Sequence, residues 1–186
     1  MSQIKGLALL SRLEYLENVK GPAVHKELLK KISSEEQNFV RQPIDGANYY
    51  PENILVEIDR ILLDEYFSGD VSEFRKLGVW SAEFLMSRFF QLYIDEQQPL
   101  QFLEQYARLR GAIIGSGEMS VEVVADGRLL ITIDYGQTVP ESVCMSELGF
   151  IEGSMRLCGA EIREVAEISC ASEPNVLESK FEISYA

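Results

Sequence analysis

An apolar stripe at helical spacing most constrains how this chain can fold. Five residues follow one another at steps of four, three, four and three: Cys144, Leu148, Ile151, Met155 and Cys158. That spacing places them on one face of a helix. Pro140 suits the first turn of a helix, and Gly159 suits the left-handed residue that follows a helix end. The sequence therefore predicts a helix over residues 140–159 that lies on a larger apolar surface.

Two glycines interrupt the same helix. Gly149 and Gly153 are four residues apart, and each costs about 1 kcal/mol relative to alanine inside a helix. A close approach of another backbone would explain why they are present. We therefore expect this side of the helix to form an important packing contact or a dimer interface.

The sequence pattern alternates with period two on both sides of this helix. Alternation over 119–124 and 129–135, joined by Asp126–Gly127, predicts a hairpin. Further strands are expected over 162–169 and 180–185. Helices are expected earlier in the chain, over 4–16, 23–32, 51–66, 70–93 and 99–111, the last ended by Gly111. The predicted fold is α+β, with an N-terminal helical layer packed on a C-terminal antiparallel sheet of β-β-α-β-β order.

Length and charge exclude several classes of protein. The 186 residues, 46% of them hydrophobic, suit a single domain over 1–186 with one sizeable core. A net charge of −13 disfavours binding to nucleic acid or to an anionic membrane surface. No apolar run is long enough to span a bilayer, and three widely spaced cysteines suit a reducing compartment. We expect a cytoplasmic protein.

Catalytic signatures are missing from the sequence. His25 is the sole histidine, and no nucleophile elbow accompanies it. The short Gly115-Ser-Gly117 segment precedes a strand, whereas a phosphate-binding loop would precede a helix. The chain is therefore not expected to be an enzyme, although an enzyme of unrecognised type is left open.

A pocket for a small molecule between the helices and the sheet has better support. Aromatic side chains and one cation on elements expected to converge would suit an aromatic or carboxylated ligand. The candidates are Tyr49, Tyr50, Trp80, Phe84, Arg88 and Tyr106. The alternative is ordinary core packing with one arginine that reaches the surface.

Several segments together resemble a known bacterial family. They are GLALLSRLEYLENVKGPAVHKELL at 6–29, Tyr-Tyr-Pro at 49–51, LGVWSAEFL at 77–85, Gly-Glu-Met-Ser-Val-Glu-Val at 117–123, LGFIEGSMRLCGA at 148–160 and Glu167-x-x-Cys170. The family is typical of myxobacteria and resembles the 4-vinyl reductase-like domains. Their wider superfamily includes haem-based nitric oxide sensors and TRAPP-type trafficking subunits. The resemblance implies a ligand-binding or scaffolding fold that is often dimeric and regulatory.

The resemblance also implies two cofactors to weigh. Zinc in related domains would correspond here to Cys144, Glu167 and Cys170, but Ser179 stands where the fourth ligand, a cysteine, is expected. Exchanging a thiolate for a hydroxyl weakens such a site, so zinc is left open. Haem sensors use a proximal histidine and a Tyr-x-Ser-x-Arg motif, and the sequence has neither. We therefore expect no bound cofactor, and the absence of these motifs argues against haem.

The sequence as a whole favours a non-catalytic regulatory or adaptor module. We expect it to form a homodimer and to bind a protein partner in a signalling or motility-type complex. The alternative is a sensor that binds a small hydrophobic or aromatic ligand. A sensor would show a filled cavity, whereas an adaptor would show a solid core and an exposed apolar patch above about 400 Å².

Overall fold

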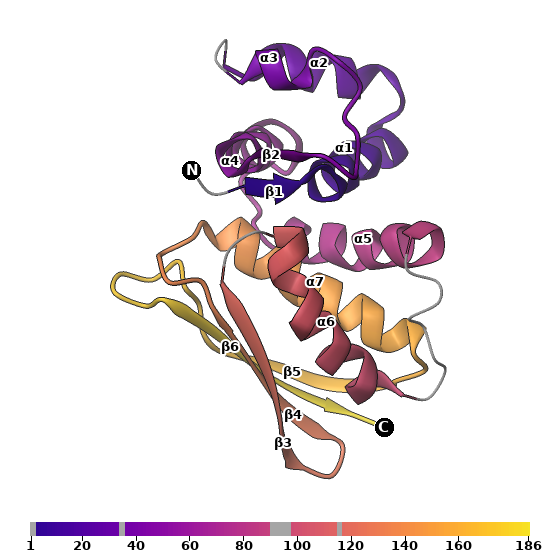
Figure 1. Cartoon of the computed structure of the whole chain (residues 1–186), viewed down its shortest axis with the longest axis vertical. Helices are drawn as coiled ribbons and strands as arrows, with labels where there is room; N and C mark the ends of the chain where they lie inside the picture. Colours follow the sequence, from indigo (N-terminus) through magenta and orange to yellow (C-terminus); the bar gives the residue numbers. More distant parts are fainter. Residues whose placement is uncertain (1–2, 34–35, 90–97, 115–116) are drawn as a thin grey trace.

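The computed structural model describes residues 3–33, 36–89, 98–114 and 117–186. The N-terminal part is helical, with one short antiparallel strand pair (Figure 1). Its elements are β1 (Gln3–Lys5), α1 (Gly6–Lys20), α2 (Ala23–Lys31), α3 (Gln37–Val40), β2 (Tyr49–Pro51), α4 (Glu52–Ile61) and a π-helix (Leu62–Tyr66). The pairing of β1 with β2 is a feature that the sequence patterns did not predict, because each strand has only three residues.

The C-terminal part builds a sheet and the helices that cover it. Its elements are α5 (Glu73–Phe89), α6 (Pro99–Ile114), β3 (Glu118–Ala125), β4 (Arg128–Asp134), α7 (Glu141–Leu157), β5 (Ile162–Ser169) and β6 (Glu178–Tyr185). Within the described residues the strands form one antiparallel sheet of order β3-β4-β6-β5. Helices α6 and α7 lie between this sheet and the N-terminal helices (Figure 1). The predicted α+β class and the β-β-α-β-β order are confirmed.

Two predicted helix boundaries need comment. The expected end of α6 at Gly111 is wrong, because the helix continues to Ile114. Gly111 does not adopt a positive φ, and it lies inside the helix with open space around it. Helix α5 was expected to reach Tyr93, but residues 90–97 lie outside the described part of the chain.

The hydrophobic core forms two clusters, although the length predicted one. The N-terminal cluster contains Leu9 and Ile58, and the C-terminal cluster contains Ile131 and Phe181. Helix α5 belongs to both clusters, since its Phe74 end packs in the first and its Met86 end packs in the second. α5 is therefore the element that joins the two halves of the protein.

Helix α7 packs tightly against α5. The five residues of its predicted apolar stripe are each at most 2% exposed. A Cβ atom at Gly149 would lie 2.0 Å from the carbonyl oxygen of Arg75, and one at Gly153 would lie 2.8 Å from that of Val79. The expected close backbone approach is thus present, and it is a contact within the chain. A homodimer stays a prediction.

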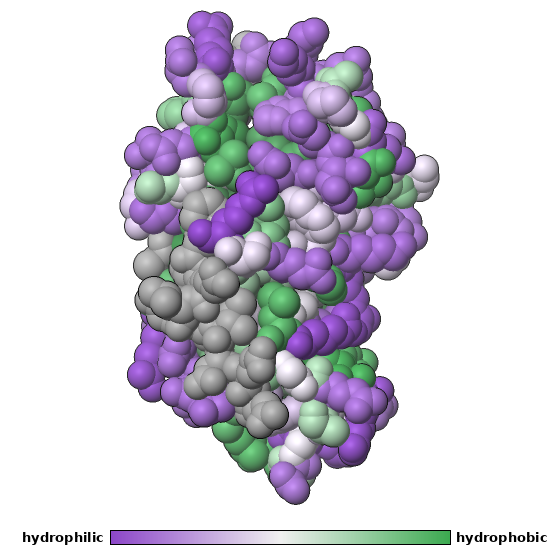
Figure 2. Space-filling model, turned by 90° about the vertical axis from the view of Figure 1, so that its right-hand side faces the viewer, coloured by the Kyte–Doolittle hydropathy of each residue, from purple (hydrophilic) through white to green (hydrophobic). Residues whose placement is uncertain are grey.

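One face of the molecule is mainly hydrophilic where its side chains are described. On the face shown in Figure 2, hydrophobic areas are small and separated by hydrophilic side chains. None of the helices in the described segments is long and apolar enough to cross a membrane.

Candidate functional site

A small apolar cavity lies where α5, α6 and α7 meet. Its volume is about 50 Å³. We call it the α5–α6–α7 cavity. Its lining residues are Leu85, Met86, Phe102, Gln105, Tyr106, Leu109, Ile113 and Phe150. Leu109 is 37% exposed, so the cavity has a mouth at the surface of α6. An apolar cavity of this kind excludes water and favours small apolar molecules.

Tyr106 is, with Gln105, one of two residues in the cavity lining that carry a polar group. Its ring stacks on Phe102 with centroids 6.2 Å apart and packs against Phe150 at 5.0 Å. Burial raises the pKa of Tyr106 far above its ordinary value, and the nearby negative charge of Glu147 raises it further. The hydroxyl therefore stays protonated, and it makes no hydrogen bond within the described residues. The hydroxyl is therefore a hydrogen-bond donor without a described partner, next to a cavity whose surface is almost wholly apolar.

A buried ion pair lies one helical turn from Tyr106. Arg110 is fully buried, and both its Nε and its Nη2 donate to the carboxylate of Glu147, the latter at 2.9 Å. The Tyr135 hydroxyl donates to the same carboxylate at 2.9 Å. Burial raises the pKa of Tyr135 well above its ordinary value, so this hydroxyl remains a donor. The network joins α6, α7 and the residue that follows β4.

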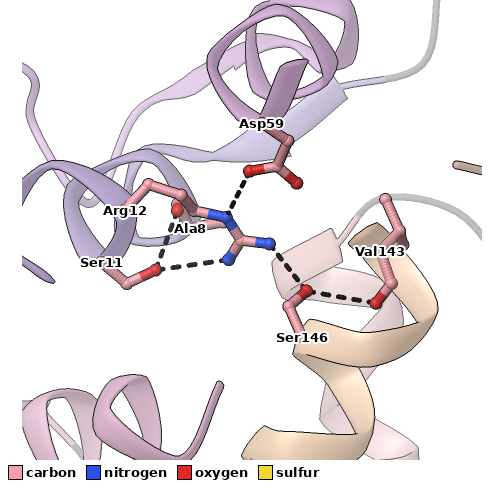
Figure 3. A network of polar contacts seen from close by, with 6 residues as sticks. All are labelled: Ala8, Ser11, Arg12, Asp59, Val143 and Ser146. Atoms are coloured by element: carbon pink, nitrogen blue, oxygen red, sulfur yellow. Dashed lines mark hydrogen bonds and ion pairs between the residues drawn. The ribbon is translucent and has the colours of Figure 1, made fainter. Parts of the chain in front are cut away.

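A second buried ion pair links the N-terminal helices to α7 (Figure 3). Arg12 on α1 donates from Nε to Oδ1 of Asp59 on α4 at 3.2 Å. Its Nη2 donates to the Ser146 hydroxyl at 2.8 Å, and Ser146 donates in turn to the carbonyl oxygen of Val143 at 3.1 Å. Because Ser146 and Glu147 are neighbours, α7 contacts both ion pairs.

The six residues predicted to form one pocket are not brought together. Tyr49 is exposed, with the Lys5 ammonium 3.6 Å from its ring centroid, and buried Tyr50 accepts a hydrogen bond from the Asp45 N–H at 2.9 Å. Both belong to β2, away from the cavity lining. Tyr49 and Tyr50 therefore contact β1 and the loop that precedes β2.

The α5 residues of the predicted pocket form a stack of their own. The rings of Trp80 and Phe84 are stacked at 14° with centroids 5.0 Å apart, and Arg88 lies exposed over the Phe84 ring at 4.5 Å. Of the six predicted residues, only Tyr106 lines the α5–α6–α7 cavity. Leu85, Met86 and Phe150 were missed, because in sequence a cavity wall has the same signature as core packing.

The cysteine cluster predicted for zinc contains two thiols and a hydroxyl. Cys144 Sγ lies 3.2 Å from Ser179 Oγ, which accepts from the Ala171 N–H at 3.0 Å. Burial raises the pKa of Cys144 to about 12, and neighbouring Cys170 adds to the rise. Glu167 is exposed on β5. Within the described residues, no three histidine, cysteine or acidic side chains are grouped to hold a metal ion.

Comparisons with known proteins identify the fold. No family model matches the chain, and no curated protein does. Solved H-NOX domains do match over 98% of this chain. One from T. tengcongensis gives a TM-score of 0.74 at 20% identity over 97% of its own length. One from S. oneidensis, in an Fe(II)NO ligation state, gives 0.77 at 13% identity over 99%. An oxygen-binding H-NOX domain related to soluble guanylate cyclases gives 0.72 at 20% identity over 95%. The chain has the H-NOX fold.

This result corrects the cofactor expectation. The sequence spoke against haem and for no cofactor, yet the fold is that of H-NOX domains, and haem distortion is the subject of another matched structure with a TM-score of 0.75. The absence of a proximal histidine and of a Tyr-x-Ser-x-Arg motif therefore did not exclude the fold of the haem-binding domains. The expected kinship with 4-vinyl reductase-like domains stays a prediction.

Haem itself does not fit the α5–α6–α7 cavity. Tyr106 and Met86 are side chains of types that ligate haem iron. A volume of about 50 Å³ is too small for a porphyrin, and the described lining has no cation for the propionates. His25 lies elsewhere, 3.6 Å from Glu17 on α1. No step of the function proposed below passes through iron.

Proposed function

We propose that this chain is a non-catalytic sensor domain whose α5–α6–α7 cavity binds a small, uncharged, mainly apolar molecule. The observation that carries the proposal is the apolar cavity itself, which is lined by Tyr106, a residue whose hydroxyl makes no hydrogen bond within the described residues. The H-NOX fold supports the sensor alternative better than the adaptor interpretation that the sequence favoured. An almost wholly apolar lining selects a mainly apolar ligand, and Tyr106 is the donor that we assign to a hydrogen bond with it.

The required affinity sets a minimum size for such a ligand. The best small ligands gain about 1.5 kcal/mol per non-hydrogen atom, so a diatomic gas held without metal reaches only about 3 kcal/mol, in the millimolar range. A micromolar Kd needs about 8 kcal/mol and therefore about six atoms. A ligand of that size extends beyond the cavity toward the mouth beside Leu109. Ring compounds of about six atoms are the smallest suitable class.

Ligand binding would reach the rest of the protein through α7. Phe150 lines the cavity, and adjacent Gly149 contacts the α5 backbone at Arg75. Ser146, one turn earlier on α7, binds Arg12 of the N-terminal helices. A shift of Phe150 would therefore move α7 at the junction of the two halves. A protein partner bound there can respond to that movement.

A matched pair of probes tests this function. Cyclopentanone and methylcyclopentane each have six heavy atoms, and only the ketone can accept a hydrogen bond from Tyr106. Both should raise the melting temperature with concentration, and the ketone more. Haemin, followed by its visible spectrum, is a third probe because of the fold. Replacing Leu85→Trp fills the cavity and should abolish the response, whereas Leu177→Trp at an exposed position should not.

Each outcome bears on the proposal. A response to the ring probes that Leu85→Trp abolishes supports it. Tyr106→Phe should then make cyclopentanone and methylcyclopentane raise the melting temperature equally. Methylcyclopentane should still bind to this variant. Binding of haemin alone would overturn the metal-free ligand class. No response to any of the three probes by the folded protein would overturn the sensor function.

A further inference from the structure

An open groove lies between α1, α2 and residues 40–44, and we call it the α1–α2 groove. Helices α2 and α3 lie at the end of the molecule away from the four-stranded sheet (Figure 1). The groove has a volume of about 610 Å³. It shares no lining residue with the α5–α6–α7 cavity. Its floor is made by buried or half-buried apolar side chains, which are Leu10, Leu29, Val40 and Ile44.

A second hollow adjoins the α1–α2 groove. It lies between α2 and α3 and has a volume of about 220 Å³. The two hollows share Leu29, Val40 and Arg41, so together they form one depression that crosses α2. Because this depression is lined from α1 to α3 and is open to solvent, it suits an extended or helical peptide segment better than a compact small molecule.

Three exposed cations line this depression. Lys26 on α2 lines the α1–α2 groove, Lys30 lines the second hollow one helical turn later, and Arg41 lines both. Within the described residues, none of these three side chains makes an ion pair or a hydrogen bond. Neighbouring Lys31, by contrast, already pairs with Glu65. The three lining cations are therefore available to the anionic groups of a ligand.

The charge of this region is opposite to that of the whole protein. Residues 20–33 contain four lysines and one glutamate, whereas the chain has a net charge of −13. Positive charge around an apolar floor is complementary to an acidic partner with apolar side chains. The α1 wall adds two carboxylates, Glu14 and Glu17, and Glu17 lies 3.6 Å from His25. These carboxylates disfavour a continuous polyanion such as nucleic acid.

We propose that the α1–α2 groove and the adjoining hollow bind an acidic segment of a partner protein that carries regularly spaced leucines. The leucines of the segment lie on the floor at Leu29 and Val40, where they lose contact with water. Its carboxylates pair with Lys26, Lys30 and Arg41. This surface goes beyond the proposed function, because it is separate from the sensor cavity.

Three fluorescent peptides of twelve residues test the proposal by anisotropy with the full chain. A peptide of four Leu-Glu-Glu repeats should bind with a Kd about tenfold lower than that of either control peptide. The controls are four Ser-Glu-Glu repeats, which lack the apolar side chains, and four Leu-Gln-Gln repeats, which lack the charge. Because the net charge of −13 repels an acidic peptide, its binding requires a local site of the opposite charge. A labelled oligothymidine of twelve nucleotides should not bind.

Charge-reversing variants connect the binding to this surface. Lys26→Glu combined with Arg41→Glu should raise the Kd of the Leu-Glu-Glu peptide about tenfold. Arg108→Glu combined with Arg163→Glu is the matched control, because it makes the same change of total charge on α6 and β5. It should change the Kd by less than about twofold. All four positions are exposed, so both variants should fold, which circular dichroism checks.

The results that overturn this proposal differ from those that overturn the sensor function. The acidic-segment site would be overturned by equal binding of the three peptides, by a Kd that the Lys26→Glu and Arg41→Glu variant leaves unchanged, or by no binding of the Leu-Glu-Glu peptide up to about 1 mM. Binding of oligothymidine in place of that peptide would also overturn it, in favour of a nucleic acid. None of these outcomes affects the response of the α5–α6–α7 cavity to cyclopentanone. Conversely, peptide binding that survives Leu85→Trp would support two separate sites.

Discussion

Arg110 and Glu147, 37 residues apart, form a bidentate ion pair that is almost completely buried. The pair connects α6 to α7, and its carboxylate also accepts the hydroxyl of Tyr135. Arg110 lies one helical turn after Tyr106, which lines the proposed sensor cavity. The pair therefore fixes the spacing of the two helices that carry Tyr106 and Phe150.

Breaking this ion pair should be costly. Removing one partner leaves an uncompensated buried charge, which typically costs about 3–5 kcal/mol. Both Arg110→Met and Glu147→Gln should lower the free energy of unfolding in urea by about that amount. The double variant should lose less than the sum of the two single losses. Additive losses would contradict a direct interaction between the two residues.

The contact between α5 and α7 should not tolerate a methyl group. Gly149→Ala places a Cβ 2.0 Å from the Arg75 carbonyl oxygen, so the helices must separate, at a cost of about 2–3 kcal/mol. Gly111→Ala is the control, because nothing lies within 4 Å and the position is helical. It should stabilise the protein by about 0.5–1 kcal/mol. Thermal denaturation of the two variants measures both effects, and equal melting temperatures would show that the helix contact is looser than described.

Cys144 should be unreactive in the folded protein. Its pKa is raised to about 12, chiefly by burial, so almost no thiolate exists at pH 8. Iodoacetamide should modify it slowly in buffer and quickly in urea, which mass spectrometry of peptides can follow. Rapid alkylation of folded protein would contradict the burial of this thiol.

The same shift gives a pH dependence. Above the ordinary thiol pKa of about 8.5, an unfolded chain loses the Cys144 proton while the folded protein keeps it. The folded state then binds more protons, so stability should fall as the pH rises from about 9 toward 12. Cys144→Ala should flatten this part of the profile measured by urea denaturation, and an unchanged slope would assign the loss to other groups.

Tyr106 should matter more for binding than for stability. Its hydroxyl makes no hydrogen bond within the described residues, so Tyr106→Phe should change the free energy of unfolding by less than about 0.5 kcal/mol. The same substitution should weaken a hydrogen-bonding ligand about fivefold to tenfold, the value of one such bond. Calorimetric titration with cyclopentanone measures the second effect. A large loss of stability would show that the hydroxyl has a structural partner.

The strongest periodic patterns predicted the structure best. The stripe from Cys144 to Cys158 gave a helix with the predicted buried face, and Asp126–Gly127 gave the hairpin. Gly111 misled, because glycine is also tolerated inside a helix that has space around it. The β1–β2 pair could not be predicted, since three residues show no period.

The candidate sites were harder to predict than the fold. Arg12 and Asp59 are 47 residues apart and meet only through tertiary packing, so no local spacing indicates their pairing. Tyr106 was predicted as a ligand-binding residue, but Leu85 and Phe150 look like core residues in sequence. The six predicted pocket residues were chosen by chemical type, and their faces on α5, α6 and β2 were unknown. The three-dimensional structure is therefore needed to see which side chains converge.

Native mass spectrometry of the purified protein tests the sensor function most directly. The account predicts a non-covalent adduct of low mass that is lost on denaturation and is absent from the Leu85→Trp variant. Added cyclopentanone should restore an adduct to ligand-free wild-type protein but not to that variant. A ligand-free spectrum that cyclopentanone and haemin both leave unchanged would contradict the account.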